Sequence, residues 1–82
     1  MYTVYILYSP RTDKYYVGYT NNLERRFSEH NRKKGKFTDA GIPWEIVHTE
    51  SFNSKKEAQA REAYIKCQKS KHYIKSLTGG SA

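Results

Sequence analysis

The chain lacks the residues for disulfide chemistry, zinc binding or membrane insertion. Its 82 residues include a single cysteine, Cys67, which excludes an internal disulfide, and no cluster of Cys and His has the spacing of a zinc site. No apolar run approaches the length of a membrane-spanning helix, and no apolar signal-peptide segment follows Met1. We therefore expect a soluble, cytoplasmic protein without a membrane partner, in which Cys67 lies on the polar side of a helix and is not a nucleophile.

Acidic residues are also scarce. The chain has 8 Asp and Glu against 15 Lys and Arg, which gives a formal net charge of +7, and it contains 8 tyrosines. A small basic chain of this composition indicates an anionic partner, most simply a nucleic acid, with a solvated cationic surface as the alternative. The length allows one small domain, which we assign to residues 1–77, and residues 78–82 are expected to form a flexible tail.

Two runs of aromatic and β-branched residues, 2–8 and 15–19, flank the turn-forming residues 9–13. This arrangement is typical of a β-hairpin. We predict a register in which Tyr5 lies directly opposite Tyr16, with both side chains on one face of the sheet. A shift by two residues would keep the pair on one face, whereas a shift by one would separate it. Two tyrosines that pack in a small core are the alternative to a functional pair.

A short helix is predicted at residues 23–31, where Asn21 and Glu24 resemble a capping box. Its apolar side chains would face the core, and Arg26 and His30 would share one edge of that face. An arginine beside the core needs an anionic partner, which could be a protein carboxylate or a substrate phosphate. His30 is equally consistent with catalysis and with a hydrogen-bonded residue at a helix end.

The alternation in residues 44–52 predicts a third strand. Its first predicted face carries Trp44, Ile46, His48, Glu50 and Phe52. Ser54 and Glu57 form a capping box that opens a longer helix, and a last short helix is predicted at residues 69–77. The element order β-β-α-β-α-α predicts an α+β fold in which helices cover a three-stranded antiparallel sheet.

Glu62 lies on the predicted inward stripe of the longer helix, between Ala58 and Ile65. A carboxylate in such a row is unusual for a plain apolar core. It could belong to a buried ion pair, for example with Arg26 or Arg61, or it could be a metal ligand that the helix holds inward.

Taken together, these residues resemble the motifs of the GIY-YIG nuclease superfamily. Ten residues separate Tyr5 of the first motif from Tyr16 of the second, and Val4 replaces the first Gly of the name motif, which removes no chemical group. The resemblance is carried by Val4-Tyr5-Ile6, Tyr16-Val17-Gly18, Leu23-Glu24-Arg25-Arg26-Phe27 and Glu62-Ala63-Tyr64-Ile65-Lys66. It covers nearly the whole chain. The best match is to small, stand-alone, single-domain members, which are similar to the N-terminal domain of the excision-repair incision subunit.

This resemblance implies an endonuclease that hydrolyses phosphodiester bonds in DNA. Tyr5 would act as the general base or position the attacking water, and Tyr16 would hydrogen-bond the water or the phosphate. Arg26 would stabilise the charge of the phosphate, and His30 is a further catalytic candidate. Gly18 would allow the backbone to approach closely at the end of its strand.

The resemblance also implies one divalent cation, Mg²⁺ or Mn²⁺, with Glu62 as its ligand. One carboxylate is a small ligand set, so substrate phosphate and water would complete the coordination shell. A free tyrosine titrates near pH 10. We expect nearby cationic charge, from Arg26, Lys14 or the metal, to lower the pKa of Tyr5.

Nucleic-acid contacts are expected at basic side chains and one threonine. These residues are Arg25, Arg32, Lys33, Lys34, Lys36, Thr38 and Lys66. Because the chain has no separate DNA-reading domain, substrate shape or a protein partner would supply specificity, and DNA repair is the process that the resemblance suggests. The alternative hypothesis is a catalytically weak or inactive nucleic-acid-binding module of the same fold.

Overall fold

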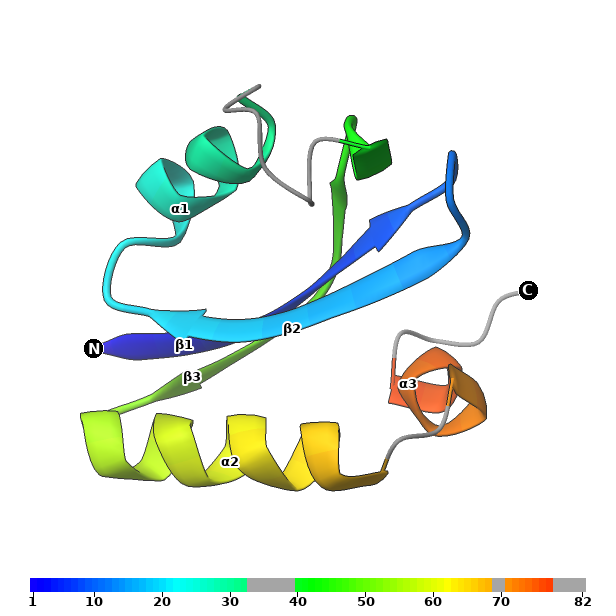
Figure 1. Cartoon of the computed structure of the whole chain (residues 1–82). Coiled ribbons are helices and arrows are strands. Elements are labelled where there is room, and N and C mark those ends of the chain that lie inside the picture. The colour runs from blue at the N-terminus through cyan, green and yellow to red at the C-terminus, as the bar shows by residue number, and fades with distance from the viewer. Residues whose placement is uncertain (33–39, 69–70, 78–82) are drawn as a thin grey trace.

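The structure is a computed structural model, and it describes residues 1–32, 40–68 and 71–77 of the chain. The helices and strands follow one another in the predicted order β-β-α-β-α-α (Figure 1). They are β1 (Tyr2–Ser9), β2 (Lys14–Thr20), α1 (Leu23–His30), β3 (Glu45–Phe52), α2 (Lys55–Gln68) and α3 (Lys71–Leu77). The predicted α+β class is confirmed, whereas the predicted tail at residues 78–82 lies outside the described residues. Within the described ranges, no helix combines the length and apolar character needed to cross a membrane.

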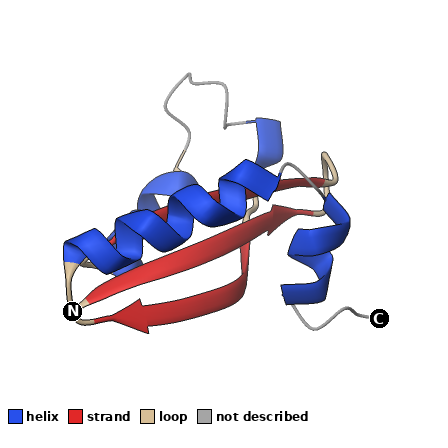
Figure 2. Cartoon of the chain, turned by 90° about the horizontal axis from the view of Figure 1, so that it is seen from below, coloured by secondary structure: helices blue, strands red, loops and turns tan. Residues whose placement is uncertain are grey.

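The three strands form one antiparallel sheet in the order β2-β1-β3, so β1 is central and β2 is an edge strand. Helix α1 covers one face of the sheet, and α2 and α3 cover the other (Figures 1 and 2). On the α2 side, Val4 and Ile6 of β1 form a buried cluster with Ala58 and Ile65 of α2. This cluster fixes α2 across the strands and confirms the predicted inward stripe of that helix.

The α1 side of the sheet holds a second, smaller cluster. Its buried residues are Tyr5, Leu7 and Trp44, and the predicted core residues Leu23 and Phe27 of α1 pack against them. Each face of β1 therefore has its own packed layer. Tyr5, a predicted catalytic residue, is thus also a core residue.

The hairpin register differs from the predicted one by two residues. Tyr5 pairs with Gly18 instead of Tyr16. The cause lies in the turn: Asp13 adopts a left-handed conformation with φ 54° and its N–H donates to the carbonyl of Ser9 at 2.7 Å, so Asp13 belongs to the turn and not to the strand. A shift of two residues leaves Tyr5 and Tyr16 on the same face, so the functional prediction survives the error in register.

Strand β3 contains an irregularity that the sequence did not predict. Ile6 pairs with His48, but Leu7 pairs with Ile46, so Val47 is an extra residue in the ladder. Such a bulge reverses the alternation on one side of it. Ile46 therefore lies on the opposite face from His48, and the prediction of one shared face for the whole strand is wrong.

Helix ends also differ slightly from prediction. Asn22, not Asn21, caps α1, because its side-chain oxygen accepts the N–H of Arg25 at 3.1 Å. The predicted cap of α2 is confirmed, since Ser54 Oγ accepts the N–H of Glu57 at 3.2 Å. Helix α1 ends one residue earlier than predicted. The described part of α3 begins at residue 71, and residues 69–70 lie outside the described ranges.

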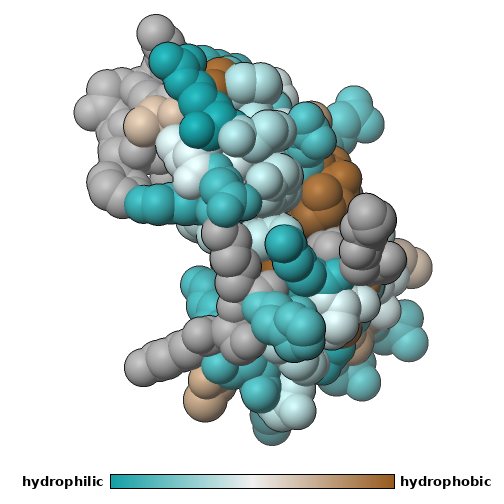
Figure 3. Space-filling model, turned by 90° about the vertical axis from the view of Figure 1, so that its right-hand side faces the viewer, coloured by the Kyte–Doolittle hydropathy of each residue, from teal (hydrophilic) through white to brown (hydrophobic). Residues whose placement is uncertain are grey.

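The surface near the β1–β2 turn and α3 is mainly hydrophilic, and apolar atoms reach it only in small areas (Figure 3). Cys67 is exposed and free, as predicted. The apolar residues of this small domain are thus largely used in its two packed layers. A candidate site must therefore be built from polar side chains at the edges of those layers.

Candidate active site

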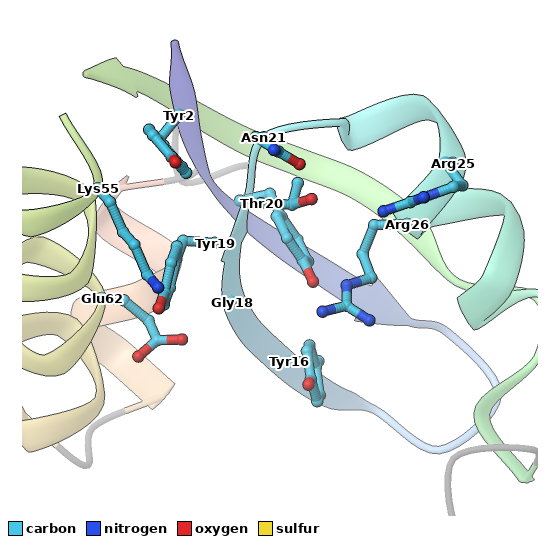
Figure 4. Close-up of a pocket in the computed structure, with 11 residues that line it drawn as sticks. Tyr2, Tyr16, Gly18, Tyr19, Thr20, Asn21, Arg25, Arg26, Lys55 and Glu62 are labelled. Carbon is cyan, nitrogen blue, oxygen red and sulfur yellow. The ribbon is translucent and has the colours of Figure 1, made fainter. Parts of the chain in front are cut away.

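A pocket of about 410 Å³ lies at the edge strand β2. Helix α1 supplies residues from one face of the sheet and α2 supplies them from the other (Figure 4). The lining residues are Tyr2, Tyr5, Tyr16, Gly18, Tyr19, Thr20, Asn21, Arg25, Arg26, Lys55 and Glu62. The pocket thus brings together every predicted catalytic residue except His30, although these residues are far apart in the sequence.

Tyr5 and Tyr16 lie near each other on the α1 side, as predicted. Their ring centroids are 6.4 Å apart and their planes differ by 21°. A Cβ atom on Gly18 would lie 2.7 Å from the hydroxyl oxygen of Tyr5 and 3.2 Å from a ring carbon of Tyr16. Gly18 is therefore required by the close approach of both rings to the strand.

Burial raises the pKa of Tyr5 to about 12, and the neighbouring Tyr16 hydroxyl adds to this effect. The Arg26 guanidinium acts in the opposite direction without offsetting the burial. Arg26 thus lowers this pKa as expected, but the burial of the hydroxyl outweighs it and the net shift is upward. Loss of hydration disfavours the phenolate more than a partly exposed arginine favours it. The Tyr5 hydroxyl is consequently protonated at neutral pH.

His30 contacts both tyrosines from the end of α1. Its Nε2 atom lies 3.3 Å from the hydroxyl oxygen of Tyr5, and its ring centroid lies 4.5 Å from that of Tyr16. The next residue, Asn31, fixes the end of the helix: its Oδ1 accepts the N–H of Trp44 at 2.6 Å and its Nδ2 donates to the Trp44 carbonyl at 3.2 Å. Two hydrogen bonds to one backbone position thus hold His30 against the tyrosine pair.

Arg26 extends from α1 into the pocket near Tyr16 (Figure 4). Its side chain is 51% exposed, and its nearest carboxylate is Glu29, one turn along the helix, at 3.5 Å. Such an exposed pair is weak, so the guanidinium can turn toward an anion in the pocket at little cost. Arg25 also lines the pocket, and among the described residues its side chain has no ion-pair partner.

Glu62 approaches the pocket from α2, with a side chain that is only 18% exposed. Neither of the partners considered from the sequence binds it. Arg61 binds Glu50 instead, and the nearest cation to Glu62 is the exposed Lys66 at 3.6 Å. The Glu62 carboxylate is thus partly buried, with a weak partner and an open pocket in front of it.

The pocket offers a small ligand set for the expected divalent cation. No group of three or more His, Cys, Asp or Glu side chains could hold a metal ion within the described parts of the chain. Glu62 is the one carboxylate among the pocket-lining residues, and its oxygens are the hard donors that Mg²⁺ prefers. The donor chemistry fits a cation whose remaining ligands are water and substrate phosphate.

The predicted nucleic-acid contacts fall into separate groups. Arg25 lines the pocket, Lys66 lies beside Glu62, and Arg32 is exposed outside the pocket lining. Four more of these residues lie outside the described ranges, namely Lys33, Lys34, Lys36 and Thr38. Their predicted contacts stay predictions.

Several lining residues were not identified from the sequence: Tyr2, Tyr19, Thr20, Asn21 and Lys55. Tyr19 and Lys55 could have been found. Tyr19 follows Gly18 on the edge strand, and Lys55 is the first residue of α2, seven residues before Glu62 and therefore on the same face of the helix. Combining the hairpin with that helix start would have placed both beside Glu62.

Comparison with known proteins identifies relatives of the chain. A UPF0213 protein of Natronomonas pharaonis is 48% identical over 64 residues, which are 77% of this chain and 74% of the relative. A UPF0213 protein of Clostridium perfringens is 47% identical over 64 residues, covering 77% of this chain and 68% of the relative. A third, from Streptococcus pneumoniae, is 42% identical over 60 residues, covering 72% of this chain and 61% of the relative. These names state no activity, and no solved structure matches the chain.

The domain comparison is more informative about chemistry. The GIY-YIG catalytic domain matches residues 1–75, which span every helix and strand up to the last part of α3. The motif residues Tyr5, Tyr16 and Gly18 that carry the sequence resemblance meet in the pocket described above. The chain therefore belongs to the GIY-YIG family, a superfamily of nuclease type.

Proposed function

We propose that the protein is an endonuclease that hydrolyses phosphodiester bonds in DNA with the help of one divalent cation, Mg²⁺ or Mn²⁺. The observation that carries this proposal is the convergence of Tyr5, Tyr16, Arg26 and Glu62 on one pocket from four different elements. A plain core would not bring a guanidinium and a carboxylate to a cavity without pairing them with each other. Phosphodiester hydrolysis needs a cation for the phosphate and an anion for the metal.

Arg26 is suited to bind the phosphate. Its guanidinium is planar and permanently charged, which suits two oxygens of a phosphate group. Tyr16 lies on the same side of β2 and offers a hydroxyl to the phosphate or to the attacking water (Figure 4). Because Gly18 has no side chain, the rings of Tyr5 and Tyr16 can lie against the strand, which places both side chains in the lining of the pocket.

The attacking water must lose a proton, and Tyr5 alone is a poor acceptor. Its pKa of about 12 keeps the hydroxyl protonated near neutral pH. His30 Nε2 lies 3.3 Å from that hydroxyl. Tyr5 can therefore take the proton of the water as its own proton passes to His30, and the imidazole becomes the final acceptor. With this relay, the buried Tyr5 side chain does not have to lose its proton before the water attacks.

Glu62 would hold the divalent cation at the α2 side of the pocket. When bound, that cation polarises the phosphate and stabilises the leaving oxygen. The protein's own part is to keep the carboxylate partly buried and weakly paired, so that it accepts a cation. One carboxylate gives weak affinity without nucleic acid, so metal and substrate should bind together.

A catalytically weak nucleic-acid-binding module is the second candidate. The raised pKa of Tyr5 and the single carboxylate of the lining favour it, because each one limits turnover by the isolated chain. A role in DNA repair, with a protein partner that supplies specificity, would be consistent with either candidate. Cleavage by the purified chain separates the two.

The test is a nicking assay on supercoiled plasmid, with Mg²⁺, with Mn²⁺ and with a chelator, alongside branched and flapped oligonucleotides. We expect nicking that depends on the cation and falls by at least about 100-fold in Arg26→Gln, since a phosphate-binding group is worth several kcal/mol in the transition state. Arg11→Gln removes the same charge at an exposed position of the β1–β2 turn, outside the pocket lining, and is the matched control. Wild-type protein that binds DNA but nicks none of these substrates would instead support the module.

A further inference from the structure

The proposed chemistry leaves part of the pocket without a role. Tyr16 and Arg26 lie on one side of β2, whereas Tyr19, Lys55 and Glu62 lie together on the other (Figure 4). Tyr5 stacks beside Tyr16. Only Glu62 of this second group enters the proposed reaction. Tyr19 and Lys55, together with Tyr2, form a distinct part of the lining that we call the α2-side subsite.

Both tyrosines of this subsite combine an anchored ring with a free polar end. Tyr2 and Tyr19 are half-buried and pack against the apolar cluster that contains Val4 and Val17, yet both line the pocket. Among the described residues, neither hydroxyl has a hydrogen-bond partner. Rings held in this way are rigid platforms that lose little entropy when a planar group stacks on them.

Lys55 adds a positive charge that no described carboxylate pairs with. Its side chain runs beside Tyr19 toward Glu62 (Figure 4). In the described ranges it makes no ion pair, because Glu62 is paired with Lys66. Arg25 is a second cation of the lining without an ion-pair partner there. Arg26 alone can bind the scissile phosphate. Lys55 and Arg25 therefore remain available to bind the neighbouring phosphates of the strand.

The size of the pocket limits what can occupy this subsite. A volume of about 410 Å³ is near the lower end of pockets that enclose small organic molecules. It has room for one nucleotide. A base can stack on the ring of Tyr19 only where one of its own faces is free of a neighbouring base, so such a nucleotide must be out of a duplex stack.

We infer that Tyr19, Tyr2 and Lys55 form a subsite for one unpaired nucleotide next to the cleaved phosphodiester. The base stacks on the tyrosines and the adjacent phosphate contacts Lys55. The preferred substrate is then DNA with an unpaired nucleotide at the site, either a single strand or a flap. A duplex pays for unpairing and unstacking before it binds, and a single strand does not. The inference rests on the proposed function for the cleavage step, but its test measures binding.

The test is fluorescence anisotropy with a labelled single strand, the matching duplex and the same duplex with a single-stranded flap, all in chelator so that no cleavage occurs. We expect the single strand and the flap to bind at least about tenfold more tightly than the duplex, since unpairing costs a few kcal/mol. Tyr19→Leu should weaken single-strand binding by about tenfold, the effect of losing one stacked base. Tyr15→Leu is its control, because Tyr15 packs against the same cluster from the same strand but does not line the pocket.

Lys55→Gln keeps the test valid even if Tyr19→Leu fails to fold, because Lys55 is exposed. It should reduce the slope of log affinity against log salt by about 0.7, as expected for one lost contact to a single-strand phosphate. Lys56→Gln removes the same charge at the next, exposed position outside the pocket and should leave the slope unchanged. Equal affinities for duplex and single strand, or equal effects of the paired variants, would overturn the subsite. An absence of nicking with intact single-strand preference would count only against the proposed function.

Discussion

Two carboxylates on the α2 side of the sheet have nearly the same burial but very different surroundings. The side chain of Glu50 on β3 is 23% exposed, and that of Glu62 on α2 is 18% exposed. Glu50 accepts two hydrogen bonds from Arg61, at 2.8 and 3.1 Å, and lies 2.8 Å from His48 Nε2. Among the residues that the structure describes, the ion-pair partner of Glu62 is the exposed Lys66 alone, at 3.6 Å. Burial alone therefore does not distinguish a structural carboxylate from a candidate metal ligand, whereas the set of partners does.

The physical difference lies in what each oxygen faces. The bidentate bond with Arg61 lowers the pKa of Glu50, and the bond with His48 adds to this effect. The carboxylate of Glu50 is thus already saturated and ties β3 to α2. Glu62 faces a pocket and can accept a cation without breaking a strong bond. Substitutions at Glu62 should therefore lower the nicking activity, and substitutions at Glu50 should lower the free energy of unfolding.

The largest expected effect is on cleavage by Glu62→Gln. We expect nicking to fall by at least about 100-fold, because the metal contributes several kcal/mol to the transition state. The melting temperature should stay unchanged or rise, as is common when a functional site is removed. The measurements are plasmid nicking, DNA binding by anisotropy and thermal unfolding by circular dichroism.

DNA binding by Glu62→Gln should persist, since the variant only removes negative charge from a pocket lined by cations. A melting temperature far below that of the wild type would mean that Glu62 is a structural ion-pair residue. Nicking at the wild-type rate would show that it holds no catalytic metal.

The sequence predicted the element order, the inward stripe of α2 and the position of Tyr5 and Tyr16 on one face, because these follow from local periodicity. It did not predict the partner of Arg61. That choice depends on how the sheet packs on α2, because Glu50 on β3 and Arg61 on α2 meet only through this contact. Local periodicity gives the face of each element but not which side chains of two packed elements meet, so the distribution of ion pairs between Glu50 and Glu62 could not be derived.

The net upward shift of the Tyr5 pKa could not be predicted for a related reason. The sequence places Arg26 near the tyrosine, and a nearby cation favours the phenolate. It cannot show that Tyr5 becomes almost fully buried beneath Gly18 while Arg26 stays half exposed. The balance between desolvation and charge is a property of the packed layers. The proposed relay to His30 follows from that balance and not from the motif.

The second expected effect is the loss of stability in Glu50→Gln. The charge-assisted bonds to Arg61 are only partly exposed, so we expect a decrease in the free energy of unfolding of about 1–2 kcal/mol, between the values for exposed and buried pairs. For a domain of this size that corresponds to a melting temperature lower by about 5–15 °C. Thermal unfolding measures it. The specific nicking activity of the folded Glu50→Gln variant should equal that of the wild type. A loss of nicking without a loss of stability would mean that Glu50, like Glu62, acts in catalysis.

The third expected effect is the pH dependence of the stability difference between the wild type and Glu50→Gln. The pKa of Glu50 is lowered from its ordinary value of 4.5 in the folded state, chiefly by Arg61. The folded state therefore binds fewer protons than the unfolded state in acid, so the contribution of Glu50 is present above pH 4.5 and is lost as the pH falls through its folded pKa. The melting temperatures of the wild type and Glu50→Gln should converge as the pH falls from 7 to 3. A gap that stays constant would mean that the carboxylate charge does not stabilise the fold.

The smallest expected effect concerns the two cations, Arg61 and Lys66, which pair with these carboxylates from the same helix. Arg61→Gln should lose about as much stability as Glu50→Gln, because it breaks the same bonds. Lys66→Gln should change the free energy of unfolding by less than about 0.5 kcal/mol, since a pair four residues apart with a 54% exposed lysine is worth no more than that. Its nicking rate at saturating DNA should stay within about threefold of the wild type, because a contact this weak does not position Glu62 and the loss of a DNA contact at Lys66 changes affinity instead. Parallel thermal unfolding and nicking of both variants measure this, and a loss of stability in Lys66→Gln as large as that in Arg61→Gln would show that Glu62 belongs to a structural ion pair after all.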